Sequence, residues 1–365
     1  MLKKLIALFI CILYSMTCWG DSILSRMTLE EKVGQLLIPD FHGEIANEDA
    51  RILIQEISVG GIVYYNSTNG LNSPEQIKKL SKSLQKLTRS NRLSIPLFIA
   101  VDQEGGVVTR LKNGFSFFPG NKTFGDTGNC DLARIVALTM GREMRSVGIN
   151  MNFAPVVDVN INPSNPIIGS RSFSSNPKTV LAFGAKALQG YRKAHVIATL
   201  KHFPGHGDVE VDSHKDLPTI HKSMKELEAV ELLPFAGLAT HADVIMTAHL
   251  LVPALDPEKC STLSEKTLTY LRKKIGFKGV IISDSLVMQG VLKQCSTIDE
   301  AVIQAFIAGC DLLLLGGGKL SGEDIRRIHS SLIEAIKSGR ISEERLNESL
   351  VRILKLKKRY LKNRA

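Results

Sequence analysis

The stretch Ile197-Ala198-Thr199-Leu200-Lys201-His202 is a short apolar run that stops abruptly at two polar residues. Seven further runs of this kind occur, at residues 35–39, 60–65, 97–102, 150–159, 243–250, 279–284 and 311–316. Amphipathic stretches separate the runs, some with helix-start signals such as Thr28 three residues before Glu31. Buried strands that alternate with amphipathic helices are typical of repeated βα units and a parallel sheet. Eight such units predict an α/β fold in the form of a single closed (β/α)8 TIM-type barrel.

Polar side chains gather at the carboxyl ends of these runs. In a barrel the carboxyl ends of all strands face one mouth, where active sites occur. Any one of these residues could instead cap a helix or close a turn, but together they favour a polar pocket suited to carbohydrate. They are Asp102, Gln103 and Glu104 after the third run, Asp158 and Asn160 in the fourth, Lys201 and His202 in the fifth, His249 in the sixth and Asp284 in the seventh.

The densest group of reactive side chains is Lys201-His202-Phe203-Pro204-Gly205-His206-Gly207-Asp208, followed closely by Asp212-Ser213-His214. The proline and the glycines preclude a regular helix, so we expect a loop that leaves the fifth strand. Asp212 and His214 are two residues apart, so their side chains can point the same way on an extended segment. A carboxylate that binds one imidazole nitrogen leaves the other nitrogen for proton transfer near neutral pH. The pair is a candidate general acid/base unit, and a surface Asp-Ser-His turn is the alternative.

Asp284 ends the run Gly279-Val280-Ile281-Ile282-Ser283-Asp284. A buried strand would deliver its carboxylate to the barrel mouth, where it could attack an anomeric carbon as a nucleophile. A helix N-cap or a metal ligand would fit the same position. The residues alone leave these three roles open.

These motifs resemble the N-acetylglucosaminidase branch of glycoside hydrolase family 3, from Met27-Thr28-Leu29-Glu30-Glu31 to the last helix. The Lys-His-Phe-Pro-Gly-His-Gly-Asp loop with its following Asp-Ser-His is the most specific part of the resemblance. The resemblance implies a retaining exo-β-N-acetylglucosaminidase without metal or organic cofactor. It makes Asp284 the nucleophile, His214 the general acid/base and Asp212 the residue that orients His214. The implied sugar contacts are Asp102, Arg110, Arg171, Lys201 and His202.

Two positions depart from the pattern of this branch. Ser285 follows the nucleophile where aspartate is often found, and Val107-Val108 follows Gly106 where an arginine is frequent. Neither departure removes a proposed catalytic group. We expect both to alter the fine substrate preference.

Other functions stay open at this point. Within the family, a β-glucosidase, a xylosidase or a phosphorylase that transfers the sugar to phosphate is possible, although many of the glucosidases take their acid from a second domain. A metal-dependent barrel hydrolase would use His202, His206 and Asp208 with His249. The alternative outside the enzymes is a non-catalytic protein that binds the cell wall. The substrates that the resemblance favours are peptidoglycan fragments or chitin oligosaccharides.

Residues 1–20 have the layout of a secretory signal peptide, because two lysines precede an apolar run at residues 5–14 and small residues follow. Cleavage there leaves residues 21–365 as the catalytic barrel domain. We therefore expect an exported protein, periplasmic or extracellular. A retained segment would act as a membrane anchor, whereas lipid attachment to Cys18 fits the preceding residues poorly.

The composition, 44% hydrophobic and 22% charged, indicates a well-buried core and excludes disorder. The formal net charge is +10, and much of the excess lies in the last helix, which we interpret as a solvated helix end. We expect a carbohydrate partner, with no nucleic acid and no obligatory protein partner. Cys130, Cys260, Cys295 and Cys310 form no CxxC pair, and their disulfide pairing is left open.

Overall fold

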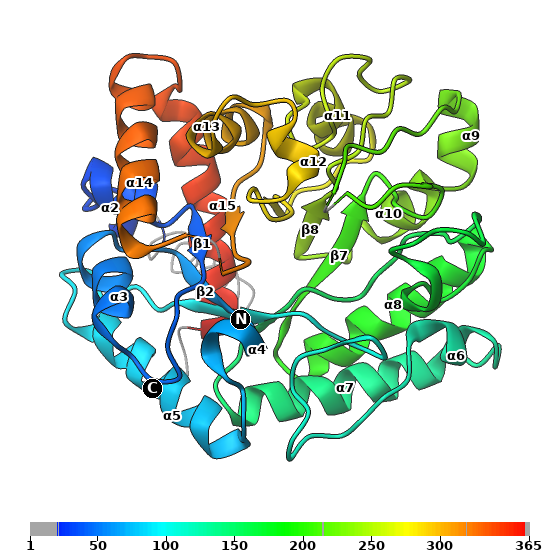
Figure 1. Ribbon diagram of the computed structural model, residues 1–365, viewed down its shortest axis with the longest axis horizontal. Helices are drawn as coiled ribbons and strands as arrows, with labels where there is room; N and C mark the ends of the chain where they lie inside the picture. Colours follow the sequence, from blue (N-terminus) through cyan, green and yellow to red (C-terminus); the bar gives the residue numbers. More distant parts are fainter. Residues whose placement is uncertain (1–19, 21, 214, 319, 362–365) are drawn as a thin grey trace, which may run out of the picture.

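Parallel strands form the centre of the molecule (Figure 1). The computed structural model describes residue 20 and residues 22–213, 215–318 and 320–361. Six strands follow the order β2-β3-β6-β7-β8-β9 in one sheet, β1 pairs with β10 in a second parallel sheet, and β4 and β5 form a short antiparallel hairpin. The bounds are β1 (Leu37–Pro39), β2 (Gly61–Tyr64), β3 (Phe98–Val101), β4 (Gln103–Gly105), β5 (Val108–Thr109), β6 (Met151–Asn152), β7 (Ile197–Phe203), β8 (Val244–Thr247), β9 (Val280–Ile282) and β10 (Leu313–Leu315).

Backbone hydrogen bonds connect the two parallel sheets at both of their edges. Ser283 N–H donates to the Leu312 carbonyl at 3.0 Å, beside a parallel bridge between Ile282 and Leu312. At the other edge, Gly60 N–H donates to the Leu37 carbonyl at 3.1 Å. The sheet is therefore strongly curled. The predicted α/β class with parallel strands is confirmed, whereas closure of a full (β/α)8 barrel stays a prediction.

The strands are shorter than most of the predicted runs. The largest difference is in the run at residues 150–159, which is a strand only at Met151–Asn152. Backbone hydrogen bonds to β7 continue beyond β6, from Thr199 N–H to the Ala154 carbonyl and from Val157 N–H to the Lys201 carbonyl. They form no regular strand there, because Pro155 has no N–H to donate. The β4–β5 hairpin was not predicted.

Helices cover the outside of the curled sheet (Figure 1). The predicted cap is present, since Thr28 and Glu31 form a reciprocal capping box, and at the last helix Ser342 accepts a hydrogen bond from Arg345 N–H. The helices are α2 (Leu29–Gly34), α3 (Glu48–Arg51), α4 (Asn66–Asn69), α5 (Pro74–Arg89), α6 (Asn121–Gly125), α7 (Asp131–Ser146), α8 (Pro177–Lys193), α9 (Met224–Ala229), α10 (Leu232–Leu238), α11 (Glu265–Thr269), α12 (Gln289–Leu292), α13 (Ile298–Ala308), α14 (Gly322–Lys337) and α15 (Glu343–Leu361), with short π or 3-10 turns η1 (Ile52–Glu56), η2 (Gly169–Arg171) and η3 (Tyr270–Lys274).

The last helix, α15, lies across the amino ends of the strands. Arg345 donates to the Cys310 carbonyl before β10, Lys357 donates to the Gly60 carbonyl before β2, and Arg359 pairs with Asp243 before β8. We predicted a solvated helix end, and this holds for only part of the helix. For Lys357 the prediction is wrong. Its side chain is fully buried over the ring of Phe98, and burial lowers the pKa of its amine.

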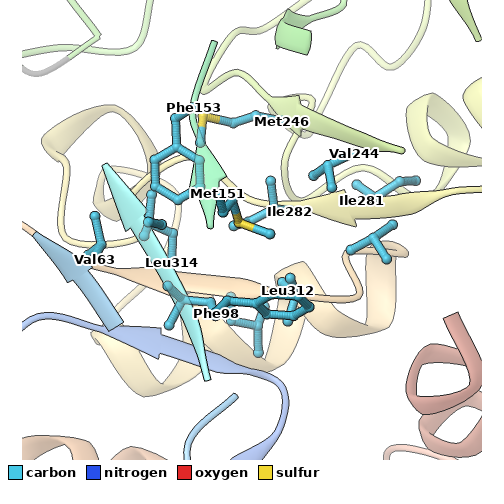
Figure 2. Close-up of a cluster of buried hydrophobic side chains, with 14 of the residues drawn as sticks. Val63, Phe98, Met151, Phe153, Val244, Met246, Ile281, Ile282, Leu312 and Leu314 are labelled. Atoms are coloured by element: carbon cyan, nitrogen blue, oxygen red, sulfur yellow. The ribbon is translucent and has the colours of Figure 1, made fainter. Parts of the chain in front are cut away.

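One hydrophobic core serves the described chain, from Ile23 to Tyr360. Figure 2 shows side chains from both parallel sheets packed together, including Val63 of β2, Met151 of β6 and Leu314 of β10. Because one apolar cluster holds both sheets, their strand ends are fixed relative to one another. Among the described residues, no helix is long and apolar enough to span a membrane.

The four cysteines of the described chain, Cys130, Cys260, Cys295 and Cys310, carry free thiols. Burial raises the pKa of Cys260 and of Cys310 to about 12. Thiols of this kind are poor nucleophiles at neutral pH, so these two act as small core residues.

Candidate active site

A polar pocket of about 280 Å³ opens at the carboxyl ends of the parallel strands. Its lining comes from β4, β7 and the segments after β2, β9 and β10, which the shared core holds in place. The predicted site residues that line it are Asp102, Arg110, Arg171, Lys201, His202 and Asp284. The volume is close to the lower end of the roughly 300–1,000 Å³ usual for small-molecule sites, which is enough for about one sugar ring.

A buried network of charges forms one wall of the pocket. Glu104 binds Arg171 through both carboxylate oxygens, with nitrogen–oxygen distances of 2.8 and 2.9 Å. Lys201 Nζ lies 2.6 Å from a Glu104 oxygen and 2.7 Å from Asp102 Oδ1. Glu104 therefore anchors both cations, and Asp102 at the pocket surface keeps one further contact with Lys201.

The electrostatics of this network fix its charge state. Burial alone would raise the pKa of Glu104, but Arg171 and Lys201 outweigh it and hold that pKa well below its usual range. Burial would lower the pKa of Lys201, but Asp102 and Glu104 raise it overall. Glu104, Arg171 and Lys201 are thus ionised at neutral pH. The wall can present fixed hydrogen-bond partners to sugar hydroxyls without rearranging.

Asp158 orients His202 from below the pocket. Its Oδ2 lies 2.7 Å from His202 Nδ1, and its Oδ1 accepts from the backbone N–H groups of His202 and His206 at 3.0 and 2.7 Å. Burial raises the pKa of Asp158, but His202 and the other donors lower it overall, so the carboxylate accepts at both oxygens. The contact with Asp158 places a proton on Nδ1 of His202, and Nε2 lies 3.4 Å from Arg171.

Asp284 follows β9 and lies partly exposed at the pocket. Its backbone N–H donates to Thr247 Oγ1 at 3.4 Å, and its Oδ1 accepts from Ser285 N–H at 2.7 Å. The Ser285 hydroxyl donates to the Gly316 carbonyl at 2.5 Å. The residue that replaces the expected aspartate therefore ties two loops together at the pocket.

The loop after β7 returns to the pocket through Ser213. His206 Nε2 lies 3.0 Å from Ser213 Oγ, and Gly290 N–H donates to the Ser213 carbonyl at 3.0 Å. A side chain at position 290 would meet that carbonyl at 2.7 Å, so this close approach requires glycine. Asp212 immediately precedes this anchor. His214, the predicted acid/base, lies outside the described residues.

His206 is fully enclosed, and its Nδ1 has no hydrogen-bond partner in the described part of the chain. Burial, followed by the neighbouring His202, lowers the pKa of His206 to about 4. The ring is therefore neutral at pH 7, and Ser213 supplies its one hydrogen bond. The contact between His206 and Ser213 therefore helps to anchor the loop.

We expect Ser213→Ala to lower the free energy of unfolding by about 1–3 kcal/mol, because it leaves a buried imidazole without any partner. Urea unfolding followed by circular dichroism measures the change. Ser330→Ala, which removes an exposed hydroxyl on α14, is the matched control and should stay within about 0.5 kcal/mol of the unchanged protein. Equal behaviour of the two variants would contradict the anchoring role.

Arg110 lies at the opposite side of the pocket, over the ring of Tyr65 at 5.8 Å. Its Nε is buried and has no hydrogen-bond partner among the described residues. Burial raises the pKa of Tyr65 well above its usual value, and the nearby Asp102, Asp40 and Asp284 raise it further, so the phenol stays neutral. Arg110 therefore keeps donor capacity that a bound hydroxyl or carbonyl oxygen could use.

His202 and His206 of the metal-hydrolase alternative are neighbours, with ring centroids 5.8 Å apart, but Asp208 and His249 are bound elsewhere. Asp208 pairs with Lys222 at 2.7 Å, away from His202 and its partner Asp158. The ring nitrogens of His249 contact Thr262 Oγ1 and the Ser285 carbonyl. Within residues 22–213, 215–318 and 320–361, no group of three or more His, Cys, Asp or Glu side chains could hold a metal ion.

The structure also adds site residues that had no assigned role. Glu104 and Asp158 had been placed at strand ends by the sequence, but not as partners of Arg171 and His202. Tyr65, which had no assigned role, and His206, which had one only in the metal-hydrolase alternative, line the pocket. In the sequence, Glu104 and Asp158 were visible as polar residues in or after apolar runs. That pattern indicates a residue at the pocket end of a strand, but it does not indicate which side chain the residue contacts.

The fold and the pocket define an α/β enzyme whose active site lies at the carboxyl ends of parallel strands. Residues 28–356 match the family described as Glycosyl hydrolase family 3 N terminal domain, and the chain belongs to this family. The resemblance inferred from the loop motifs is confirmed.

The similar proteins include named hexosaminidases. Beta-hexosaminidase A of Pseudoalteromonas piscicida is 38% identical over 326 residues, which cover 84% of this chain and 54% of that protein. Beta-hexosaminidase of Pseudomonas aeruginosa is 33% identical over 293 residues, which cover 80% of this chain and 84% of that protein. The chain thus spans about half the length of the first relative and most of the second.

Solved structures show the same arrangement. A glycoside hydrolase family 3 beta-N-acetylglucosaminidase from Paenibacillus sp. str. FPU-7 superposes with a TM-score of 0.87 at 44% identity, covering 92% of this chain and 63% of that chain. LpqI of M tuberculosis superposes with a TM-score of 0.83 at 30% identity, covering 93% of this chain and 96% of that chain. The similarity therefore extends over nearly the whole described fold.

Proposed function

We propose that the chain is a retaining exo-β-N-acetylglucosaminidase that releases terminal non-reducing β-linked N-acetylglucosamine. The observation that carries this proposal is the convergence of Asp284, the Lys201–Glu104–Arg171 network and the oriented His202 in one pocket of about 280 Å³. Such a pocket offers the Asp284 carboxylate beside several fixed polar partners. The names of the similar hexosaminidases support the choice of sugar.

The proposed reaction is a double displacement. Asp284 attacks the anomeric carbon while His214, oriented by Asp212, protonates the departing oxygen. The glycosyl–Asp284 ester then reacts with water, whose proton His214 accepts, and the sugar leaves with its original anomeric configuration. Asp102, Arg110, Arg171, Lys201 and His202 hold the hydroxyl and acetamido groups of the sugar.

We also propose that the chain forms a closed (β/α)8 barrel in a single catalytic domain. Its eight strands would be β1, β2, β3 and β6–β10. Hydrogen bonds at both junctions between the parallel sheets and the single apolar core support closure. A closed barrel would keep its strand ends, and thus the pocket wall, at fixed separations.

We also propose, on the basis of residues 1–20, that the protein is exported. Export would place the enzyme in the periplasm or outside the cell. A retained segment would anchor it to a membrane. Peptidoglycan fragments and chitin oligosaccharides are the substrates such a location offers, and peptidoglycan turnover is the corresponding process.

The test compares aryl β-N-acetylglucosaminide with aryl β-glucoside. We expect kcat/KM to be at least about 10²-fold higher for the acetamido sugar, because a site built to bind a polar group discriminates strongly against its absence. A preference for the glucoside would reject the proposed specificity. Added phosphate that diverts the product to a sugar 1-phosphate would identify a phosphorylase instead.

A further inference from the structure

The face at the amino ends of the strands, which α15 crosses, is rich in lysine and arginine. Three segments lie there: residues 192–195 at the end of α8, residues 272–278 before β9 and residues 355–359 of α15. None of the three contains an aspartate or a glutamate. Six of their cations are exposed and pair with no carboxylate in the described part of the chain, and we term these six the basic face. They are Arg192, Lys193, Lys273, Lys274, Lys278 and Lys355.

The ends of α8 and α15 are neighbours on this face. Arg192 at the end of α8 donates to the His241 carbonyl at 2.6 Å. Asp243, two residues later, pairs with Arg359 at 2.5 Å and accepts a hydrogen bond from the Tyr360 hydroxyl. Burial raises the pKa of Tyr360, and the positive charges of Arg359 and Arg192 both oppose that rise. The two helix ends therefore bring their cations together.

The segment before β9 is fixed to the same helix. Val280 N–H, at the start of β9, donates to the backbone carbonyl of Asp243 at 3.0 Å. Arg272 of this segment pairs with the buried Asp311 at 2.5 Å, and Asp311 also binds Arg352 of α15 at 3.0 Å. The three segments thus form one continuous surface, held by contacts that leave the six cations of the basic face in solvent.

Two loops at the pocket end of the molecule carry the opposite charge. Residues 40–49 after β1 contain four carboxylates and no lysine or arginine, and residues 207–216 after β7 contain four carboxylates and one lysine. On the amino-end face, Asp243 is paired with Arg359, and Asp311 is buried among arginines. A negatively charged surface therefore attracts the basic face and repels these two loops, which orients the whole molecule.

The N-terminal segment joins the described fold beside α15. A side chain at Gly20 would lie 4.0 Å from Cβ of Leu354. The residues before it include the apolar run at 5–14. Val351, one of the exposed large hydrophobic residues, lies one helical turn from Lys355 on the outer side of α15. Apolar groups therefore accompany the cations, which favours a lipid bilayer over a purely polar polyanion as the partner.

We propose that the basic face docks on an anionic phospholipid bilayer. Lysine and arginine side chains near such a bilayer are attracted by its negative surface potential, within about one Debye length. An apolar segment and a polybasic patch together are two signals of the kind that stable membrane attachment requires. Docking by this face directs the pocket, at the opposite ends of the strands, away from the bilayer. The inference does not depend on which sugar the pocket binds.

The test measures the fraction of the full chain that sediments with vesicles, at about 0.1 M salt. One set of vesicles is phosphatidylcholine alone, and the other contains about 30% phosphatidylglycerol. We expect phosphatidylglycerol to raise the bound-to-free ratio about tenfold or more. The triple variant Lys193→Gln, Lys278→Gln, Lys355→Gln removes one cation from each segment and should reduce that gain at least about fivefold. Binding to neutral vesicles reports the apolar residues 5–14 and should be equal in both proteins.

The matched control is the triple variant Lys78→Gln, Lys79→Gln, Lys82→Gln on α5, whose three lysines are also exposed. It changes the net charge equally but away from the basic face, so the gain should stay within about twofold of the unchanged protein. Equal losses in the two triple variants, or no gain from phosphatidylglycerol in the unchanged protein, would overturn the inference. Tighter retention by inorganic polyphosphate than by the anionic vesicles would also overturn it, because the partner would then be a polyanion.

Hydrolysis by the bound protein tests the orientation. With the pocket directed away from the bilayer, the vesicle-bound chain should hydrolyse aryl β-N-acetylglucosaminide at the rate of the free chain within about twofold. A bound chain that loses activity while the free chain keeps it would contradict docking by the basic face. Both triple variants should keep the free-chain rate, since none of their residues lines the pocket.

Discussion

Asp284→Asn is expected to lower kcat for aryl β-N-acetylglucosaminide by about 10³-fold or more, because the amide cannot form the glycosyl ester. The substitution keeps the size of the side chain, and the amide oxygen can still accept from Ser285 N–H. We therefore expect the free energy of unfolding to stay within about 1 kcal/mol of the unchanged protein. Steady-state kinetics and urea unfolding on the same preparation measure both quantities.

Asp216→Asn is the matched control for this variant. Asp216 is an exposed carboxylate that pairs with Lys293 at the surface, at 2.5 Å. Removing that charge should leave kcat unchanged within about twofold, since exposed ion pairs contribute little. An Asp284→Asn enzyme with substantial turnover would remove the proposed nucleophile.

Glu104→Gln is expected to lower the free energy of unfolding by about 3–5 kcal/mol, because it leaves Arg171 and Lys201 buried beside a neutral amide. Activity should fall as well, since both cations belong to the sugar-binding wall. Glu56→Gln is the matched control: Glu56 also bridges two arginines, Arg51 at 2.7 Å and Arg326 at 2.6 Å, but its side chain is 39% exposed. That variant should lose no more than about 1 kcal/mol.

The stability that Glu104 contributes has a defined pH dependence. Arg171 and Lys201 hold its folded pKa well below that of the unfolded chain, which is about 4.3 for glutamate. The contribution is therefore complete above that unfolded pKa and is lost as the pH falls towards the folded pKa. Urea unfolding between pH 7 and pH 3 should show the difference between the unchanged protein and Glu104→Gln shrinking at the acidic end. A difference that grows with acid would contradict the ion network.

The strands were predictable because parallel strands are buried on both faces and read as apolar runs. The runs at residues 60–65 and 279–284 contain β2 and β9 with small errors at the ends. The run at residues 150–159 is a regular strand only at Met151–Asn152, because an apolar pattern does not show where the backbone pairing becomes irregular. The β4–β5 hairpin is too short to have a strand periodicity of its own.

The sequence allowed us to predict that six of the proposed site residues meet at one pocket, but not how they pair. Lys201 and Asp284 end apolar runs, so the fold alone carries them to one mouth. That Glu104 holds both Lys201 and Arg171 depends on side chains 67 or more residues apart in the sequence, and no local pattern encodes it. The proposed roles of the site residues come from the motif resemblance, and their contacts come from the structure.

Lys357 shows a signal that was present and misread. It lies three or four residues after Ile353 and Leu354, which are on the apolar stripe of the last helix. Helical periodicity therefore places Lys357 on the buried face. Its charge suggested solvent exposure, but α15 lies across the strand ends and brings the amine to the Gly60 carbonyl.

The central claim is that Asp284 forms a covalent bond to the sugar. Mass spectrometry of the enzyme treated with 5-fluoro-β-N-acetylglucosaminyl fluoride, followed by peptide mapping, tests it directly. The account predicts one added 5-fluoro-sugar per chain, located on the peptide that contains Asp284. Turnover of the reagent with no adduct, or an adduct on a different residue, would contradict it.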